Sequence, residues 1–470
     1  MPLEWSGSTP ELLLTVARDS SEPLRSQLER QIREAIRVGR LDVGERLPSS
    51  RVLATALGLS RGLVQECFAQ LIAEGYLVSR VGDGTRVASG VCGPPSPPQP
   101  PRQEVRLLAD FRAGVPDLRG FPMSDWLWAQ REAARDIPTA DLDYGDPRGS
   151  EVLRTVLAGY LRRVRAAVTD PARIVVCAGY AQGLRLALQV LAARGVRVLA
   201  FEDPGVPESA GVAAAEFGIT AVPVPVDEDG IDVAALAETS ARAVIVSPAH
   251  QWPTGVVLAP ARRLALLDWA REVDGFVIED DYDAEFRYDR EPVGAVQGLD
   301  ADRVITIGTV SKSLVPALRI GWLLCPVGLV EAITEVKHRT DRGSPTLDQL
   351  ALAVLIESGR YDRHLRRMRA TYATRRTALL DALARHAPEL PLTGLAAGFH
   401  AVAHVAHADE RELIDAALAR SVGLYGMSEC RADHTRTPTR IVLGFGNTTD
   451  RAITEGIAAI GDLLRPQRRP

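Results

Sequence analysis

The chain has 470 residues, of which 55 are basic, 60 are acidic and 46% are hydrophobic, so it is long enough for several domains. Its net charge of −5 excludes a chain that is basic throughout, so any surface for nucleic acid must be local. The five cysteines are widely spaced, no apolar run is long enough to span a membrane and no secretory signal is visible, so we expect a cytoplasmic protein without disulfides, a metal site or a membrane span.

The first 90 residues begin with the pattern of two short helices. Residues spaced four apart mark the apolar face of a first helix: Leu28, Ile32 and Ile36. Pro48-Ser49-Ser50 is an N-cap signal for a second helix over Arg51–Leu57, and Gly58 ends that helix.

A third helix follows at once, with Ser60 as its N-cap. Its predicted apolar stripe contains Val64, Phe68, Leu71 and Ile72. Arg61 and Gln65 lie together off that stripe. A helix, a tight glycine turn and another helix make a helix-turn-helix, in which the second helix presents its first side chains to base edges.

A predicted hairpin completes this segment, because Tyr76–Arg80 and Thr85–Val87 flank the turn Gly82-Asp83-Gly84 and would serve as a wing. Five arginines cluster on the whole motif: Arg46, Arg51, Arg61, Arg80 and Arg86. Residues 1–90 contain 11 Arg and 11 acidic residues, so charge alone does not exclude a small protein-interaction module. The pattern favours DNA binding over that alternative.

Four motifs closely resemble the winged helix-turn-helix of the GntR family of bacterial regulators: LPSSRVLA (47–54), LGLSR (57–61), LIAEGYL (71–77) and VGDGTRV (81–87). The resemblance implies that Arg51, Arg61 and Gly82 contact DNA. It also places Gln65 in the recognition helix, at a position that is usually basic or polar in that family. Gly62 departs from the family, in which a small hydroxyl residue or Asn is common there.

A proline-rich stretch, Gly93–Arg102, follows this segment. Six of the eight residues from 94 to 101 are Pro, which favours an extended spacer and excludes a helix or a central strand. We therefore predict a winged helix-turn-helix domain over 1–92, a linker over 93–104, a large α/β domain over 105–326 and a smaller α+β subdomain over 327–470.

The long part alternates apolar, β-branched runs with helical runs such as 181–191 and 261–273. The predicted strands are RIVVC (173–177), VRVLAF (196–201), RAVIVS (242–247), FVIED (276–280) and RVITIG (303–308). Strands that are nearly all apolar are typical of a parallel sheet buried on both faces. This predicts an α/β domain with its active groups at the carboxyl ends of the strands.

Only two of the 55 basic residues are lysines, and a guanidinium cannot replace an amine in chemistry. Lys312 lies just past a predicted strand in GTVSKSLVPALRIGWL (308–323), a setting that suits a Schiff-base amine with a lowered pKa. Thr309 could donate to a phosphate there and Arg319 could neutralise it. This motif alone leaves open that Lys312 is a solvated surface residue. Lys337, in EVKHR, is predicted to be a surface helix residue.

Three further features bear on Lys312. Asp280 ends a very apolar strand, so it either faces a cation, such as a protonated pyridine nitrogen, or caps the next turn; Tyr282 could donate to a ring hydroxyl. The segment RIVVCAGYAQGLRLAL (173–188) predicts a strand, a glycine turn and a helix whose amino end would bind a phosphate. Arg440 precedes IVLGF, where it could clamp a carboxylate, although alone it is one of 53 arginines.

Together these features resemble the fold type I, pyridoxal phosphate (PLP)-dependent aminotransferases. The motifs are YGDPRGSEVLR (144–154), CAGYAQG (177–183), FEDPG (201–205), SPAHQWPTG (247–255), IEDDYDAEF (278–286) and SKSL…RIGW (311–322). The resemblance implies that Lys312 forms the internal aldimine with PLP, that Asp280 pairs with the pyridine nitrogen and that Tyr282 bonds the ring oxygen. It implies that the phosphate is held by Gly179, Tyr180, Thr309 and Arg319. It also implies that Tyr144 reaches the partner subunit's phosphate site and that Arg440 grips the substrate α-carboxylate.

A GntR-type head joined by a linker to such a domain resembles the MocR/GabR-type regulators over almost the whole chain. The resemblance implies a homodimer that binds a double-stranded DNA operator at two half-sites. It implies sensing of an amino compound, or of PLP itself, through an aldimine at Lys312, and control of genes of amino-acid, amine or vitamin B6 metabolism. Glu208 lies near the position of a substrate-binding Arg in the GABA-responsive member, so we do not expect a GABA effector.

Two alternatives stay open. The chain could be a catalytically active aminotransferase with a regulatory head, or its large domain could be a dimerisation platform that has lost its cofactor. Trp252 stands where ordinary aminotransferases place an Asn, so we expect at most weak or partial transamination.

Overall fold

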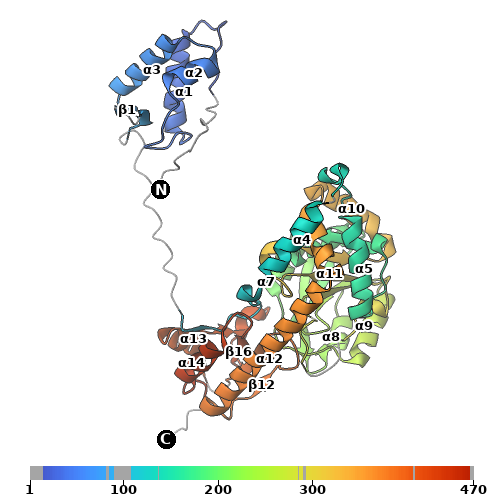
Figure 1. Ribbon diagram of the computed structural model, residues 1–470. Helices are drawn as coiled ribbons and strands as arrows, with labels where there is room; N and C mark the ends of the chain where they lie inside the picture. Colours follow the sequence, from blue (N-terminus) through green and yellow to red (C-terminus); the bar gives the residue numbers. More distant parts are fainter. Residues whose placement is uncertain are drawn as a thin grey trace. The chain divides into compact units, whose positions relative to one another are not determined.

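A computed structural model describes residues 14–80, 84–88, 107–135, 137–283, 285–288, 293–405 and 408–465. The chain divides into two compact units, Met1–Glu104 and Val105–Pro470, and each unit has its own hydrophobic core (Figure 1). The expected linker, and Gly82 in the expected wing, lie outside the described residues. Over the described ranges, no helix is both long and apolar enough to cross a membrane, and no cluster of three His, Cys, Asp or Glu side chains could hold a metal ion.

The first unit contains three helices and an antiparallel hairpin: α1 (Leu24–Arg37), α2 (Ser50–Leu57), α3 (Arg61–Ala73), β1 (Leu77–Arg80) and β2 (Gly84–Val87). Both predicted N-caps are present. Ser49 Oγ accepts from the Val52 N–H at 3.3 Å, and Ser60 Oγ accepts from the Leu63 N–H at 3.2 Å. Gly58, with φ of 63°, ends α2 in the left-handed conformation and turns the chain into α3. The predicted helix-turn-helix is therefore confirmed.

The core of this unit contains the predicted face of α1, but the stripe of α3 differs at one position. The buried residues of α3 are Val64, Cys67, Phe68 and Leu71, whereas Ile72 is 37% exposed. At about 100° per residue, Ile72 lies roughly 90° from the centre of that stripe, and Cys67 lies inside it. The prediction of a buried Ile72 was wrong for this reason.

The second unit is built on an eight-stranded sheet with the order β4-β11-β10-β9-β8-β5-β6-β7. Its strands are β4 (Ile174–Cys177), β5 (Val198–Asp203), β6 (Thr220–Asp227), β7 (Gly230–Ile231), β8 (Ala243–Val246), β9 (Phe276–Asp281), β10 (Val304–Thr309) and β11 (Gly321–Leu324). All five predicted strands are present, with small shifts at their ends.

The sheet is mixed, whereas the sequence predicted a parallel one. Strands β6, β5, β8, β9 and β10 run parallel, but β11 pairs antiparallel with both β10 and β4, and β7 pairs antiparallel with β6. Side chains alternate across a strand in the same way in both orientations, so an apolar run does not reveal its direction. The antiparallel β11 begins in the RIGW motif and was not predicted as a strand.

Helices cover both faces of this sheet. On one face, Ile278 and Ile305 belong to a core shared with α6 (Tyr180–Ala193), α7 (Pro207–Ala215) and α10 (Val327–Asp341). On the other face, Val277 and Val304 pack with α8 (Val233–Ala237) and α9 (Pro260–Glu272). Adjacent residues of β9 and β10 thus serve opposite cores, which explains why these strands are apolar throughout.

A smaller antiparallel sheet has the order β12-β13-β16-β15. The strands and helices of this part are β12 (Leu392–Thr393), β13 (His400–His404), β15 (Tyr425–Gly426), β16 (Arg440–Gly444), α13 (Glu410–Ala419) and α14 (Asp450–Ile460). The short strand β3 (Ala109–Asp110) pairs in parallel with β14 (Val422–Gly423), so the first described residues of the second unit join the small part. Long-range pairing of this kind has no local sequence signal.

The remaining helices are α4 (Met123–Arg135), α5 (Glu151–Arg165), α11 (Thr346–Glu357) and α12 (Arg360–His386). Helix α11 packs against α4 and α5, and α10 packs against α6, so both helices that follow the expected boundary at residue 326 contact the large part. The 27-residue helix α12, orange in Figure 1, contacts α11 and also α14, and it therefore connects the large part with the small one.

Candidate functional site

The predicted lysine and aspartate lie at the carboxyl ends of neighbouring strands. Asp280 in β9 pairs with Ile307 in β10, and Lys312 follows the end of β10. The Lys312 ammonium donates a hydrogen bond to the Gly114 carbonyl at 2.5 Å. A Cβ on Gly114 would lie 3.6 Å from the Trp252 indole, so Trp252 lies beside the same backbone.

Burial sets the ionisation of this pair. It lowers the pKa of Lys312, against the opposing effect of the Asp280 and Asp283 carboxylates. It raises the pKa of Asp280 well above its ordinary value, and Asp281 adds to that rise. Among the described residues, Asp280 Oδ1 is buried and has no hydrogen-bond partner. Such an atom is unfavourable unless a ligand supplies a donor or a cation.

Tyr282 lies in a buried hydrogen-bonded group beside this pair. Its hydroxyl donates to the His250 carbonyl at 3.0 Å, and His250 Nδ1 lies 2.7 Å from the Asp283 carboxylate. The rings of His250 and His400 are 4.8 Å apart. Sequence reasoning did not identify these two histidines and Asp283, although His250 and Asp283 stand in the quoted motifs SPAHQWPTG and IEDDYDAEF.

Glu202, near the end of β5, is a further buried carboxyl group that the sequence did not single out. Its Oε2 accepts from the Ser247 N–H at 3.0 Å and from the Gln251 amide at 3.4 Å. Burial raises the pKa of Glu202 to about 8, despite these two hydrogen bonds. The sequence signal that could have identified Glu202 is the one that identified Asp280, namely an acidic residue at the end of an apolar strand.

The amino end of α6 faces an arginine. Gly179 has φ of 97° and precedes α6, and no side chain caps that end. A Cβ on Gly179 would lie 3.4 Å from the Arg319 guanidinium, which places this cation beside the free N–H groups of the helix. A Cβ on Gly321 would lie 2.7 Å from Gly179 Cα, so this close approach requires glycine. The pair can bind an anion.

Two more residues of the predicted phosphate set lie nearby. Thr309 ends β10, and its hydroxyl accepts from the Ser311 N–H at 3.1 Å. Tyr180 is the first residue of α6, and its buried hydroxyl has no partner within the described part of the chain. Burial, followed by the charges of Asp280 and Glu202, raises the pKa of Tyr180. As the first residue of α6, Tyr180 has a backbone N–H at the helix end that can bind an anion.

Tyr144 and Arg440 are not brought into this group by hydrogen bonds or ion pairs over the described residues. Tyr144 is 72% exposed, and its ring centre lies 6.0 Å from the Arg342 guanidinium. Arg440 begins β16 opposite His404, and its buried Nε has no hydrogen-bond partner among the described residues. Burial, followed by repulsion from Arg431, lowers the pKa of Arg440.

The prediction for the second lysine was wrong. Lys337 was expected on a helix surface, but its side chain is fully buried on the face of α10 that packs against α6. Its Nζ donates to Asp341 Oδ2 at 2.7 Å and to Ser344 Oγ at 3.1 Å. The charged residues of EVKHR predicted a solvent-exposed side chain, whereas tertiary packing buries Lys337.

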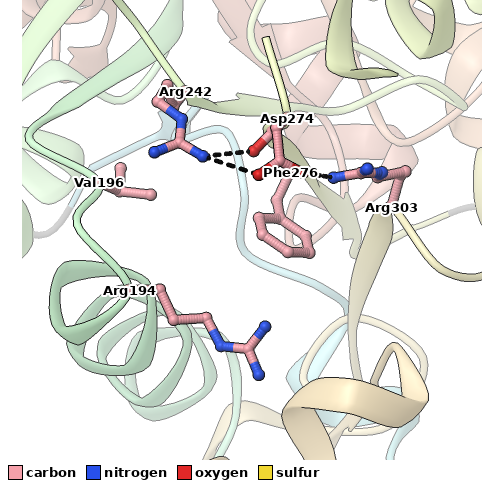
Figure 2. Close-up of a pocket in the computed structure, with 6 residues that line it drawn as sticks. All are labelled: Arg194, Val196, Arg242, Asp274, Phe276 and Arg303. Atoms are coloured by element: carbon pink, nitrogen blue, oxygen red, sulfur yellow. Dashed lines mark hydrogen bonds and ion pairs between the residues drawn. The ribbon is translucent and has the colours of Figure 1, made fainter. Parts of the chain in front are cut away.

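A separate cavity of about 410 Å³ lies at the opposite edge of the large sheet (Figure 2). It is lined by Arg194, Val196, Arg242, Asp274, Phe276 and Arg303. These residues precede or begin β5, β8, β9 and β10, so the cavity lies at the amino ends of the strands. Asp274 accepts from both Arg242 and Arg303 there. Ligands of open α/β sheets bind at the carboxyl ends, which is where Lys312 lies.

In the first unit, the three side chains predicted to contact DNA are exposed to solvent. Arg51 is the second residue of α2, Arg61 begins α3 and Gln65 lies one turn later, and all three are exposed. Arg86 in the hairpin is half-buried and donates to the Gly44 carbonyl at 2.9 Å. The exposed start of α3 is the part of a helix-turn-helix that can enter a major groove.

Each of the two units matches a known protein family. Residues 24–87 match the bacterial regulatory proteins of the gntR family, and residues 110–460 match aminotransferase class I and II. The HTH-type transcriptional regulator YdeL of Bacillus subtilis is 34% identical, covering 93% of this chain and 95% of that protein. The probable rhizopine catabolism regulatory protein MocR of Rhizobium meliloti is 32% identical, covering 95% of each.

The pyridoxine biosynthesis transcriptional regulator PdxR of Corynebacterium glutamicum is 32% identical and covers 96% of this chain and 98% of that protein. Among solved structures, an archaeal alanine:glyoxylate aminotransferase superposes with a TM-score of 0.70 at 25% identity, covering 77% of this chain and 91% of that one. Fold and comparisons define the class as helix-turn-helix transcriptional regulators. The chain belongs to the family, MocR among its members, that joins a GntR-type DNA-binding head to an aminotransferase class I and II domain.

This fold implies pyridoxal phosphate as the cofactor. The residues present fit it on three counts. Asp280 offers a buried oxygen that needs a donor, Lys312 has an amine whose pKa burial lowers, and Gly179 with Arg319 forms an anion-binding helix end. A pyridine nitrogen, an aldehyde and a phosphate are the matching groups.

Proposed function

We propose that this regulator senses an amino compound, or PLP itself, at Lys312 and that the outcome changes DNA binding by its helix-turn-helix head. The observation that carries the proposal is the pair of Lys312, with its pKa lowered by burial, and Asp280, with a buried oxygen that lacks a partner. Bound PLP supplies an aldehyde that reacts reversibly with amines and a ring that withdraws electrons.

Three side chains would hold the ring. Lys312 would provide the amine to which the cofactor attaches. Asp280 would accept from the protonated pyridine nitrogen, and the charge of that cation would lower the pKa of the Asp280 carboxyl group. The Tyr282 hydroxyl, which now donates to the His250 carbonyl, would bond the ring oxygen.

The phosphate would lie at the amino end of α6. Gly179 and Tyr180 would donate backbone N–H groups, the Thr309 hydroxyl would donate a hydrogen bond, and Arg319 would neutralise charge. The exposed Tyr144 would complete the site of a second subunit in a homodimer. Arg440, whose buried Nε lacks a partner, would bind the carboxylate of an amino-acid effector.

On the DNA side, GntR-type regulators bind DNA, and we propose Arg51, Arg61, Gln65 and Gly82 as the contacts in this chain. Two heads in a cytoplasmic homodimer would occupy two half-sites. The names of its relatives point to genes of vitamin B6 synthesis or amine catabolism as targets, since PdxR is named for pyridoxine biosynthesis and MocR for rhizopine catabolism.

DNA footprinting upstream of its own gene, with and without PLP and a panel of amines, tests the proposal. We expect wild type to protect a discrete site with an affinity that PLP or an amine changes about tenfold, and Lys312→Ala to bind without that response. Arg61→Ala should weaken binding about tenfold, whereas Arg40→Ala, which changes an exposed arginine outside α2 and α3, should not. The proposal fails if no site is protected or if Lys312→Ala responds like wild type.

An active aminotransferase is the second candidate, because Lys312 follows β10 and Asp280 lies near the end of the neighbouring strand β9. Keto-acid formation from a panel of amino donors distinguishes the two. Turnover well above that of Lys312→Ala would favour the enzyme, and the absence of any half-reaction would exclude it.

A further inference from the structure

The buried Lys337 is the starting observation. An ammonium group inside a protein requires compensating partners, and here they are Asp341, one turn later on α10, and the Ser344 hydroxyl. The Asp341 side chain is 28% exposed, and an ion pair with a partner that reaches solvent contributes little to stability. Stability is therefore a weak explanation for this pair, and its geometry points to another one.

Asp341 connects the pair to α6. The same Oδ2 atom that accepts from Lys337 also accepts from the Gln182 side-chain amide at 2.6 Å. Gln182 in turn uses its Oε1 to accept from the Ala178 N–H at 2.7 Å. Burial opposes ionisation of Asp341, but the bonds from Lys337 and Gln182 hold its pKa below the ordinary value, so the carboxylate stays charged.

This chain of bonds ends at the residue before Gly179. Gln182 lies in the first turn of α6 and reaches back to the N–H of Ala178, as the glutamine of a capping box reaches back across a helix start. That bond fixes the Ala178 peptide and leaves the next N–H groups of α6 without a side-chain partner. Those free groups, beside Arg319, are the ones a phosphate would use.

We propose that Lys337, Asp341 and Gln182 are positioning residues that hold the amino end of α6 in the orientation required by the cofactor's phosphate. These three residues form the Lys337 relay. It touches neither the lysine amine at position 312 nor the ring site, so it acts on phosphate recognition and not on attachment of the aldehyde. The proposal rests on the proposed function, which places the phosphate at this helix end.

The test compares PLP with pyridoxal, which has the same ring and aldehyde but no phosphate. Cofactor-free full-length protein is titrated with each compound, and binding is followed by visible absorbance. We expect Lys337→Met and Gln182→Leu each to weaken PLP binding about tenfold, the equivalent of one lost hydrogen bond, while pyridoxal binding changes less than about twofold. Gln182→Leu also covers the case in which Lys337→Met fails to fold, since it leaves the Lys337–Asp341 ion pair intact.

Arg339→Met is the matched control. It removes a cation from the same helix and breaks an ion pair of the same spacing, Glu335–Arg339, whose side chains are exposed. We expect it to bind both compounds like wild type. Equal losses for PLP and pyridoxal in the relay variants, or no loss at all, would overturn the proposal. Absorbance in wild type that is unaffected by Lys312→Ala would instead refute the proposed function, so the two failures are distinguishable.

Discussion

Glu202 shows how burial changes the ionisation of a single residue in this protein. Its pKa is raised to about 8, from an ordinary value of 4.5, because the carboxyl group is removed from water. Between those values the folded chain keeps the proton that the unfolded chain releases. The contribution to stability is therefore complete below pH 4.5 and is lost as the pH rises through 8.

Glu202→Gln tests this directly, because the amide keeps an acceptor for the Ser247 N–H and cannot ionise. We expect the free energy of unfolding of cofactor-free wild type to fall, relative to the variant, by about 2 kcal/mol between pH 5 and pH 7. Urea unfolding followed by tryptophan fluorescence measures it, since five of the six tryptophans lie in the second unit. Identical pH profiles for the two proteins would show that Glu202 is ionised when folded.

Residues differ in how far the sequence reveals them. Lys312 and Asp280 were predictable because each follows or ends an apolar strand, and parallel strands end at a common edge. Lys337 was not, since its burial depends on α10 packing against α6, a contact between segments far apart in the chain. The His250–Asp283 pair is of the same kind, because a lone His or Asp in a loop shows no partner until the fold brings one.

Among the elements, α12 has a specific relation to the lysine loop. The Tyr361 hydroxyl donates to Ser313 Oγ at 2.8 Å, and His364 Nε2 lies 2.8 Å from the Ser313 carbonyl. Burial lowers the pKa of His364 to about 4, so the imidazole is neutral near pH 7 and can donate that bond. The residue after Lys312 is thus held from the helix that joins the large and small parts of the second unit.

Tyr361→Phe should loosen this hold. We expect affinities for PLP and for pyridoxal to fall together by about fivefold, because the change acts on the lysine loop and not on the phosphate end. Tyr372→Phe is the matched control. It removes another buried hydroxyl of α12, one that accepts from the Asp117 N–H at 2.9 Å, far along the helix from Ser313. An equal fall in affinity for both variants would show a general loss of stability instead.

Elements were predictable where local signals mark them. Serine N-caps and the left-handed Gly58 identified the helices of the head, and apolar runs identified five strands of the large sheet. The antiparallel β11 and the pairing of β3 with β14 were missed, since the direction and partner of a strand are set by long-range hydrogen bonds. The mixed sheet follows from the first of these pairings.

For the molecule as a whole, the two compact units with separate cores predict separable activities. A chain shortened to residues 105–470 should bind PLP at Lys312 with wild-type affinity and protect no DNA, because the exposed Arg51, Arg61 and Gln65 belong to the first unit. Absorbance titration and footprinting check the two halves of this expectation. A folded fragment that fails to bind PLP would show that the head contributes to the cofactor site.

The lysine content has a practical consequence for labelling chemistry. Of the two lysine side chains, Lys337 is fully buried and paired with Asp341. An acylating reagent applied to the folded protein should therefore modify Lys312 and not Lys337. Borohydride treatment of the PLP-loaded protein should accordingly fix the cofactor on one lysine peptide, with almost no signal from other lysine peptides. Mass spectrometry of that peptide would then report occupancy directly, and an effector that displaces Lys312 from the cofactor would appear as a loss of the tag.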